Sequence, residues 1–139
     1  MEQSGGSTII PCLRYRDPHA AIDWLCQAFG FERHAVYEND AGEVEHAQLA
    51  YGRGMVMLGG VRDNEFGRHI AQPDEIGGRE QCACVTVTDC KAHYERAKAA
   101  GAVIVDDYAE KDYGGAGYSC HDPEGHLWYI GSYDPWQPE

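Results

Sequence analysis

The residues of this sequence that could hold a metal or attack a substrate are six cysteines and seven histidines. Cys82 and Cys84 stand two positions apart, which places both thiols on one face if the segment is a strand. A structural zinc site usually combines two ligand pairs, each spaced roughly two to four residues, and no C-x-x-C occurs here. The thiols are therefore interpreted as packed or free cysteines of a reduced protein. The alternative, a nucleophile at Cys82, requires a neighbouring base or cation.

Two histidines fall in segments with the character of strands. His46 shares a strand face with Gln48, and His121 shares one with Ser119. If these faces converge, His46 and His121 could build a metal or ligand site; otherwise both are ordinary hydrogen-bonded strand residues. The remaining histidines show no ligand spacing such as H-x-x-x-H. We expect His126, at the tip of a predicted turn, to be solvated.

The secondary-structure elements that position these residues begin with a predicted strand and helix. Two residues mark the ends of that helix. Residues 9–17 predict a short strand, and residues 18–29 predict a helix. Asp17 is suited to the N-cap and Gly30 to a left-handed closing residue. Along the helix, apolar side chains recur every three to four positions, at Ala21, Ile22, Leu25 and Phe29.

The second half of the sequence repeats this strand-helix unit. Residues 81–89 predict another strand and residues 90–100 another helix, with Asp89 72 positions after Asp17 and Gly101 71 positions after Gly30. An internal repeat of this kind determines the topology of the whole chain.

Each predicted helix leads into three strand-like segments separated by turn residues. The segments are 32–37, 45–51 and 54–58 in the first half, and 102–108, 117–121 and 126–133 in the second. The glycine-rich run 114–117 predicts a turn or bulge, or a close approach of the backbone to a ligand. The prediction is one α+β domain over residues 1–139. It contains two tandem βαβββ modules, residues 8–60 and 81–133, joined by a linker at 61–80.

The net charge of the chain limits the kinds of molecule that it can bind. The chain carries 23 acidic and 11 basic residues, a net charge of -12, and it has no basic stripe. Nucleic acid would be repelled by such a field. No apolar run approaches the roughly 20 residues of a membrane helix, and the first eight residues are polar, unlike a signal peptide. We therefore expect a cytoplasmic protein that binds neither nucleic acid nor a membrane.

Three landmarks in order resemble the vicinal-oxygen-chelate superfamily, which includes glyoxalases, bleomycin-resistance proteins and extradiol dioxygenases. They are the Asp17-to-Phe31 and Asp89-to-Ala102 segments and the sequence Asp-Pro-Glu-Gly-His-Leu at 122–127. The resemblance covers residues 8–133. It implies two mixed or antiparallel sheets, each with a helix on its outer face, curved around one central small-molecule cleft.

The resemblance also implies where a divalent metal would be held in related enzymes, by a His in each module's first strand and a Glu in each last strand. In this sequence those positions carry Ile10, Met57, Cys82 and Tyr129. None is a usual ligand in the family except Cys82, and one thiolate does not hold a catalytic ion alone. The sequence therefore predicts a family member without the usual metal site and without a cofactor.

Two classes of function remain open. The first is metal-free binding of a small, partly aromatic compound of the sequestering, bleomycin-resistance type, in a cleft with candidate residues Met57, Cys82, Cys84, Tyr129, His46 and His121. The alternative is a lyase, isomerase or dioxygenase with a divalent metal displaced to His46, His121 or Cys82, or a metal-free enzyme with Tyr129 as acid or base. The resemblance and the exposed sheet edges also imply a homodimer.

Overall fold

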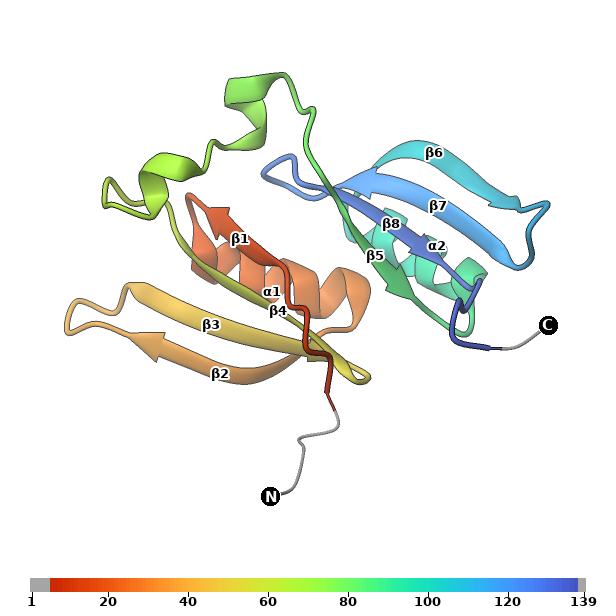
Figure 1. The fold of residues 1–139 in the computed structure, drawn as a ribbon, viewed down its shortest axis with the longest axis horizontal. Helices are drawn as coiled ribbons and strands as arrows, with labels where there is room; N and C mark the ends of the chain where they lie inside the picture. The colour runs from red at the N-terminus through yellow and green to blue at the C-terminus, as the bar shows by residue number, and fades with distance from the viewer. Residues whose placement is uncertain (1–5, 138–139) are drawn as a thin grey trace. The chain divides into compact units, whose positions relative to one another are not determined.

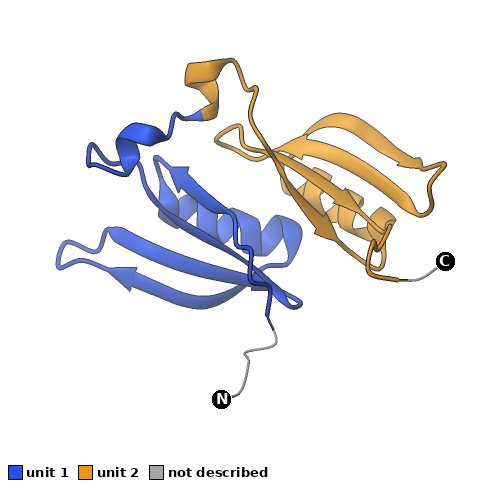
Figure 2. Cartoon of the chain, viewed as in Figure 1, with its two compact units in different colours: residues 1–72 blue, residues 73–139 orange. Residues whose placement is uncertain are grey.

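The computed structural model describes residues 6–137 and divides the chain into two compact units, residues 1–72 and 73–139 (Figure 2). Each unit contains one four-stranded sheet and one α-helix that packs against it (Figure 1). The predicted α+β fold of two βαβββ modules is confirmed. The predicted cleft involves both units and stays a prediction.

Unit 1 follows the strand-helix-three-strand order that the sequence predicts. Its elements are β1 (Cys12–Tyr15), α1 (Pro18–Phe29), β2 (Glu32–Glu38), β3 (Val44–Tyr51) and β4 (Gly54–Gly60). The sheet order is β1-β4-β3-β2, with β1 parallel to β4 and the other pairs antiparallel. Helix α1 carries the chain from β1 across the sheet to β2 at its other edge, and β3 and β4 then lead back to pair with β1.

The boundaries of α1 are set by the two residues predicted for them. Asp17 Oδ1 accepts a hydrogen bond from the Ala20 amide at 3.1 Å, and Gly30 adopts the left-handed conformation with φ of 83°. The apolar side chains of α1 are buried as predicted, and they pack against one face of the sheet. This burial is the main source of stability in unit 1.

Unit 2 repeats this arrangement after two 3-10 helices, Gly67–His69 in unit 1 and Pro73–Ile76 in unit 2. Its elements are β5 (Ala83–Thr86), α2 (Cys90–Ala99), β6 (Val103–Glu110), β7 (Ala116–His121) and β8 (Leu127–Gly131). The sheet order β5-β8-β7-β6 matches that of unit 1, again with one parallel pair. Within residues 6–137, no helix has the length and apolar character required to cross a membrane.

The core of unit 2 is filled mainly from the sheet. The side chains that α2 buries are small or polar, Cys90, His93 and Ala97. Trp128 and Tyr118 supply the volume instead, and both are fully buried. Large rings with a polar atom need a hydrogen-bond partner in such a place; the Tyr118 hydroxyl lies 2.7 Å from His93 Nδ1, and Trp128 Nε1 donates to Asp122 Oδ2 at 3.1 Å.

The turn between β7 and β8 differs from the sequence-based expectation. His126 is 4% exposed rather than solvated, and its Nδ1 lies 3.3 Å from Glu80 Oε1. The reason is Asp122, whose Oδ1 accepts from the amides of Glu124 and His126 and folds the turn back over the sheet.

We predict that Asp122→Ala lowers the free energy of unfolding by about 3 kcal/mol, because it leaves buried donors of Trp128 and the turn without their acceptor. Urea denaturation followed by circular dichroism measures this change. The matched control in the same unit is Asp89→Ala. That substitution removes one N-cap bond, from the Ala92 amide, and is expected to cost about 1 kcal/mol. Equal losses in the two variants would contradict the central role of Asp122.

Candidate functional site

In each unit the helix covers one face of the sheet, and we call the opposite face the open face. Side chains alternate along a strand, so the buried residues identify which positions belong to it. In unit 1, Cys12, Met57 and Gln48 are paired across β1, β4 and β3 and share the open face. His46 and Tyr37 continue that face onto β3 and β2. Two predicted residues, Met57 and His46, thus lie on one surface.

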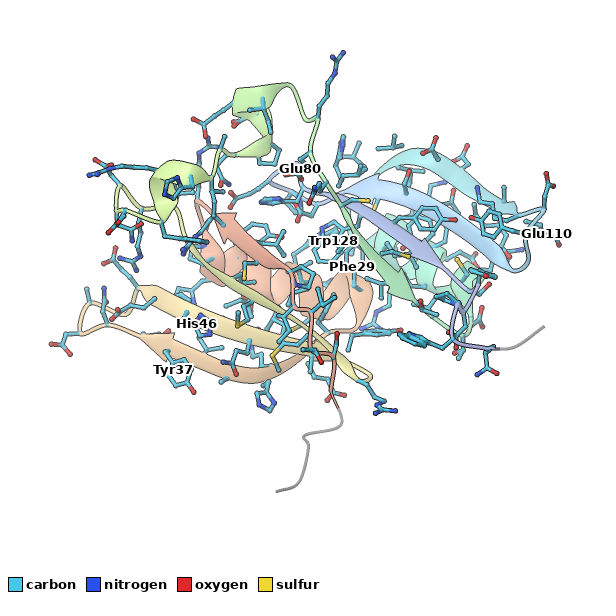
Figure 3. All side chains as sticks on the ribbon, in the orientation of Figure 1. Phe29, Tyr37, His46, Glu80, Glu110 and Trp128 are labelled. Atoms are coloured by element: carbon cyan, nitrogen blue, oxygen red, sulfur yellow. The ribbon has the colours of Figure 1, made fainter. Side chains whose placement is uncertain are left out.

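His46 is held between an aromatic ring and an amide. Its ring stacks on that of Tyr37, with centroids 6.0 Å apart and an interplanar angle of 20° (Figure 3). Its Nε2 lies 3.2 Å from Gln48 Nε2. An amide nitrogen only donates, so in this contact the imidazole nitrogen is the acceptor. The Tyr37–His46 pair presents a flat aromatic surface with an amide at its side.

Arg14 is a residue of the open face that sequence reasoning missed. Its guanidinium lies 5.3 Å from the centroid of the Phe66 ring and against Gly59, where an added Cβ would come within 2.7 Å of Nη1. The signals in the sequence were the alternation of Arg14 with Cys12 and a glycine in the facing strand. Arg14 supplies a cation beside the apolar and aromatic groups of unit 1.

In unit 2 the open face contains three of the predicted residues. Cys84 and Ser119 are the cross-strand partners of Tyr129 on β5 and β7, and His121 lies two residues beyond Ser119 on the same face. Ser119 Oγ donates to Asp106 Oδ2 at 2.5 Å. The structure therefore brings Cys84, Tyr129 and His121 onto one surface, whereas His46 and His121 belong to different units and their convergence stays a prediction.

The Tyr129 side chain lies over the glycine-rich run. An added Cβ at Gly117 would overlap its hydroxyl, so glycine is required there to let the ring lie against the sheet. The hydroxyl is 2.9 Å from that of Tyr113. Burial, followed by this hydrogen bond, raises the pKa of Tyr129 to about 12. The phenol keeps its proton at neutral pH and acts as a hydrogen-bonding group, which argues against Tyr129 as a base.

The Cys84 thiol on this face is not activated as a nucleophile. Cys82 lies just before β5 and Cys84 within it, and both are exposed. Burial, reinforced by the nearby Cys82, raises the pKa of the Cys84 thiol. A catalytic thiolate needs the opposite shift, from a cation or base beside it. The surroundings of Cys84 therefore favour a thiol that contacts a ligand over a thiol that acts as a nucleophile.

The positions at which the family holds its metal are filled by other side chains. Ile10 precedes β1, while Met57, Cys82 and Tyr129 occupy the stretches of chain expected for the other three ligands. Across residues 6–137, no three side chains of His, Cys, Asp or Glu gather closely enough to hold a metal ion. The donor set does not fit a chelating divalent centre.

Comparison with known proteins identifies relatives over nearly the whole chain. The family model described as Glyoxalase/Bleomycin resistance protein/Dioxygenase superfamily matches residues 9–130. Uncharacterized protein Mb0911c of Mycobacterium bovis is 31% identical over 121 residues, which span 87% of this chain and 80% of the relative.

Solved structures give the same result. The crystal structure of TioX from Micromonospora sp. ML1 is 34% identical, with a TM-score of 0.73 over 91% of this chain and 98% of that one. The crystal structure of UcmS2 is 18% identical, with a TM-score of 0.71 over 91% and 99% of the two chains, and shows likeness of fold alone.

We predict that Tyr113→Phe lowers the pKa of Tyr129, because it removes the hydrogen bond that holds the phenol in its protonated form. A spectrophotometric titration of the tyrosines should show the late-ionising group of the wild-type protein moving to lower pH. Tyr37→Phe is the control and should leave that group unchanged. An unmoved late transition in Tyr113→Phe would contradict the pairing of the two hydroxyls.

The raised pKa of Tyr129 also predicts an alkaline loss of stability. Between pH 10 and about 12 the unfolded chain releases this proton while the folded chain keeps it, so the unfolded state binds fewer protons and stability falls as pH rises. Denaturation of the wild-type protein and Tyr129→Phe across that window measures the effect. The variant should lose less stability, and parallel curves for the two proteins would refute the prediction.

Proposed function

The chain belongs to the glyoxalase/bleomycin resistance protein/dioxygenase superfamily, and from this premise we propose that it binds a small, partly aromatic organic molecule without a metal. The proposed role is sequestration rather than catalysis. Membership of the family gives the fold, but not the reaction, because function resides in the residues of the site. The candidate residues for this site lie on the open faces of the two sheets.

The observation that carries the proposal is the Tyr37–His46 stack beside Gln48 and Met57 on unit 1. A flat aromatic pair offers stacking, a thioether adapts to an irregular apolar ligand, and the amide provides one directed hydrogen bond. Binding sites for small molecules combine a largely apolar surface with a few oriented polar groups in this way.

Unit 2 offers a second surface of complementary character. The paired hydroxyls of Tyr113 and Tyr129 and the Ser119–Asp106 hydrogen bond give it donors and acceptors around one aromatic ring. Neither the Tyr129 phenol nor the Cys84 thiol is ionised at neutral pH by its surroundings. This supports binding by contact and hydrogen bonding over acid-base or covalent chemistry.

We also propose that the protein is cytoplasmic and forms a homodimer. The outer strands of each sheet, β1 and β2 in unit 1 and β5 and β6 in unit 2, end the order of hydrogen-bonded strands, and unpaired edges of this kind favour association. All six cysteines are free, which is the usual condition in a reducing compartment. Sedimentation equilibrium tests the dimer directly.

Thermal-shift measurements test the proposed binding. Purified protein is screened against Mn, Fe, Ni, Zn and Mg salts and against a library of small aromatic compounds. We expect stabilisation by a subset of the aromatic compounds and none by the metals. Stoichiometric metal in the purified protein with a clear shift on adding that metal would overturn the proposal in favour of an enzyme with a displaced site at His46, His121 or Cys82.

Substitutions locate the binding surface once a stabilising compound is found. Tyr37→Ala and His46→Ala should each weaken binding about three- to tenfold, the range of one stacking interaction. The control is His19→Ala, which changes an exposed histidine on α1, on the helix side of unit 1. Calorimetric titration gives the dissociation constants. Equal binding by all three variants would place the ligand elsewhere.

A further inference from the structure

Cys82 and Cys84, two of the candidate cleft residues, also form a pair of thiols with a chemistry of its own. Cys84 is the second residue of β5 and faces away from α2, because its neighbours Ala83 and Val85 are paired with the buried Trp128 and Ile130. Cys82 precedes it by two positions, the spacing that returns to the same side of an extended chain. Both side chains are exposed.

The two sulfur atoms lie within electrostatic reach of one another, since the pKa of Cys84 is raised by Cys82 as well as by burial. Other cysteines differ in their surroundings. Cys12 Sγ donates to the Ile10 carbonyl at 3.8 Å, and Cys90 Sγ to the Ile130 carbonyl at 3.7 Å. Among the described residues, neither Cys82 nor Cys84 has a hydrogen bond that competes for its sulfur. Both sulfurs are available to a ligand.

We propose that Cys82 and Cys84 form a two-coordinate site for a soft, thiophilic cation such as Cu(I). Their α-carbons are about 6.6 Å apart in an extended chain. Two metal–sulfur bonds of about 2.3 Å in a line span about 4.6 Å, which rotation of two cysteine side chains on one face can reach. On binding, each thiol releases a proton to water and each sulfur donates one electron pair. The copper stays Cu(I), and no oxidant or reductant is consumed.

The chemistry of the site selects the cation. Thiolates favour Cu(I) and Zn, but Zn takes four ligands where this pair supplies two, and Mg and Mn require several oxygen ligands. The chain's net charge of -12 attracts cations and opposes anions. Tyr129, directly across from Cys84 on β8, has a phenol that keeps its proton and leaves the two sulfurs as the ligands. The pair lies in unit 2, whereas the Tyr37–His46 stack that carries the proposed function lies in unit 1. A failure of copper binding and a failure of aromatic-ligand binding are therefore observed in different variants.

Competition with the chromophoric chelator bicinchoninate, under anaerobic reducing conditions, measures the site. We expect the wild-type protein to withhold one equivalent of Cu(I) per chain. Cys82→Ser and Cys84→Ser should each hold it about 100-fold more weakly, because the second sulfur of a chelating pair acts at high effective concentration. The matched control is Cys12→Ser, which removes the single exposed thiol of unit 1 and should bind as the wild-type protein does.

Thiol labelling provides a measurement that does not depend on a variant. In the folded wild-type protein the three exposed cysteines, Cys12, Cys82 and Cys84, react with a thiol reagent. One equivalent of Cu(I) should protect Cys82 and Cys84 and leave Cys12 reactive, as read by mass spectrometry of the labelled peptides. Labelling of all three in the presence of Cu(I), one copper per two chains, or an equal loss of binding in Cys12→Ser would each overturn the proposal.

Discussion

The buried carboxylate of Asp122 determines how unit 2 presents its residues. It accepts from the amides of the β7–β8 turn and from Trp128 Nε1, which lies beneath the sheet at zero exposure. Because neighbours on a strand point to opposite faces, burial of Trp128 places Tyr129 on the open face. The register of β5 with β8 then places Cys84 across from it. The Asp122 carboxylate therefore helps to determine which residues lie on the open face of unit 2, although Asp122 itself is not one of them.

The two units reach the same topology with different cores. In unit 1 the helix supplies Ile22, Leu25 and Phe29, and the sheet packs on them. In unit 2 the helix is polar and its buried side chains are small, so the sheet must supply the large rings. The polar atoms of those rings require Asp122 and His93 as partners. The internal repeat therefore conserves the arrangement of elements while the hydrogen bonds that stabilise each half differ.

Two positions at which the family resemblance implied metal ligands, Met57 and Tyr129, lie on the open faces of the sheets. Met57 lies opposite Gln48, and Tyr129 lies over Gly117 with its hydroxyl on Tyr113. An apolar thioether and a protonated phenol contribute contact area and a hydrogen bond, the properties of a binding surface. The Cys82–Cys84 pair adds sulfur donors on the same face of unit 2, with a preference for soft cations.

The sequence by itself determined the repeat, the limits of α1 and nearly all of α2, and the order of elements along each half. These follow from local rules, since Asp17 and Asp89 cap the helices and Gly30 and Gly101 take positive φ values that other residues avoid. It also placed His46 on one strand face with Gln48, because side chains alternate along a strand.

Only the tertiary structure decided the partners of those side chains. The burial of His126 beside Glu80 departed from the expectation. It depends on which distant residues pack against the turn. The stacking of Tyr37 on His46, the contact of Arg14 with Phe66, and the raised pKa of Tyr129 arise between strands or loops separated in the sequence. Side-chain partners of this kind depend on packing in three dimensions, which local spacing does not specify.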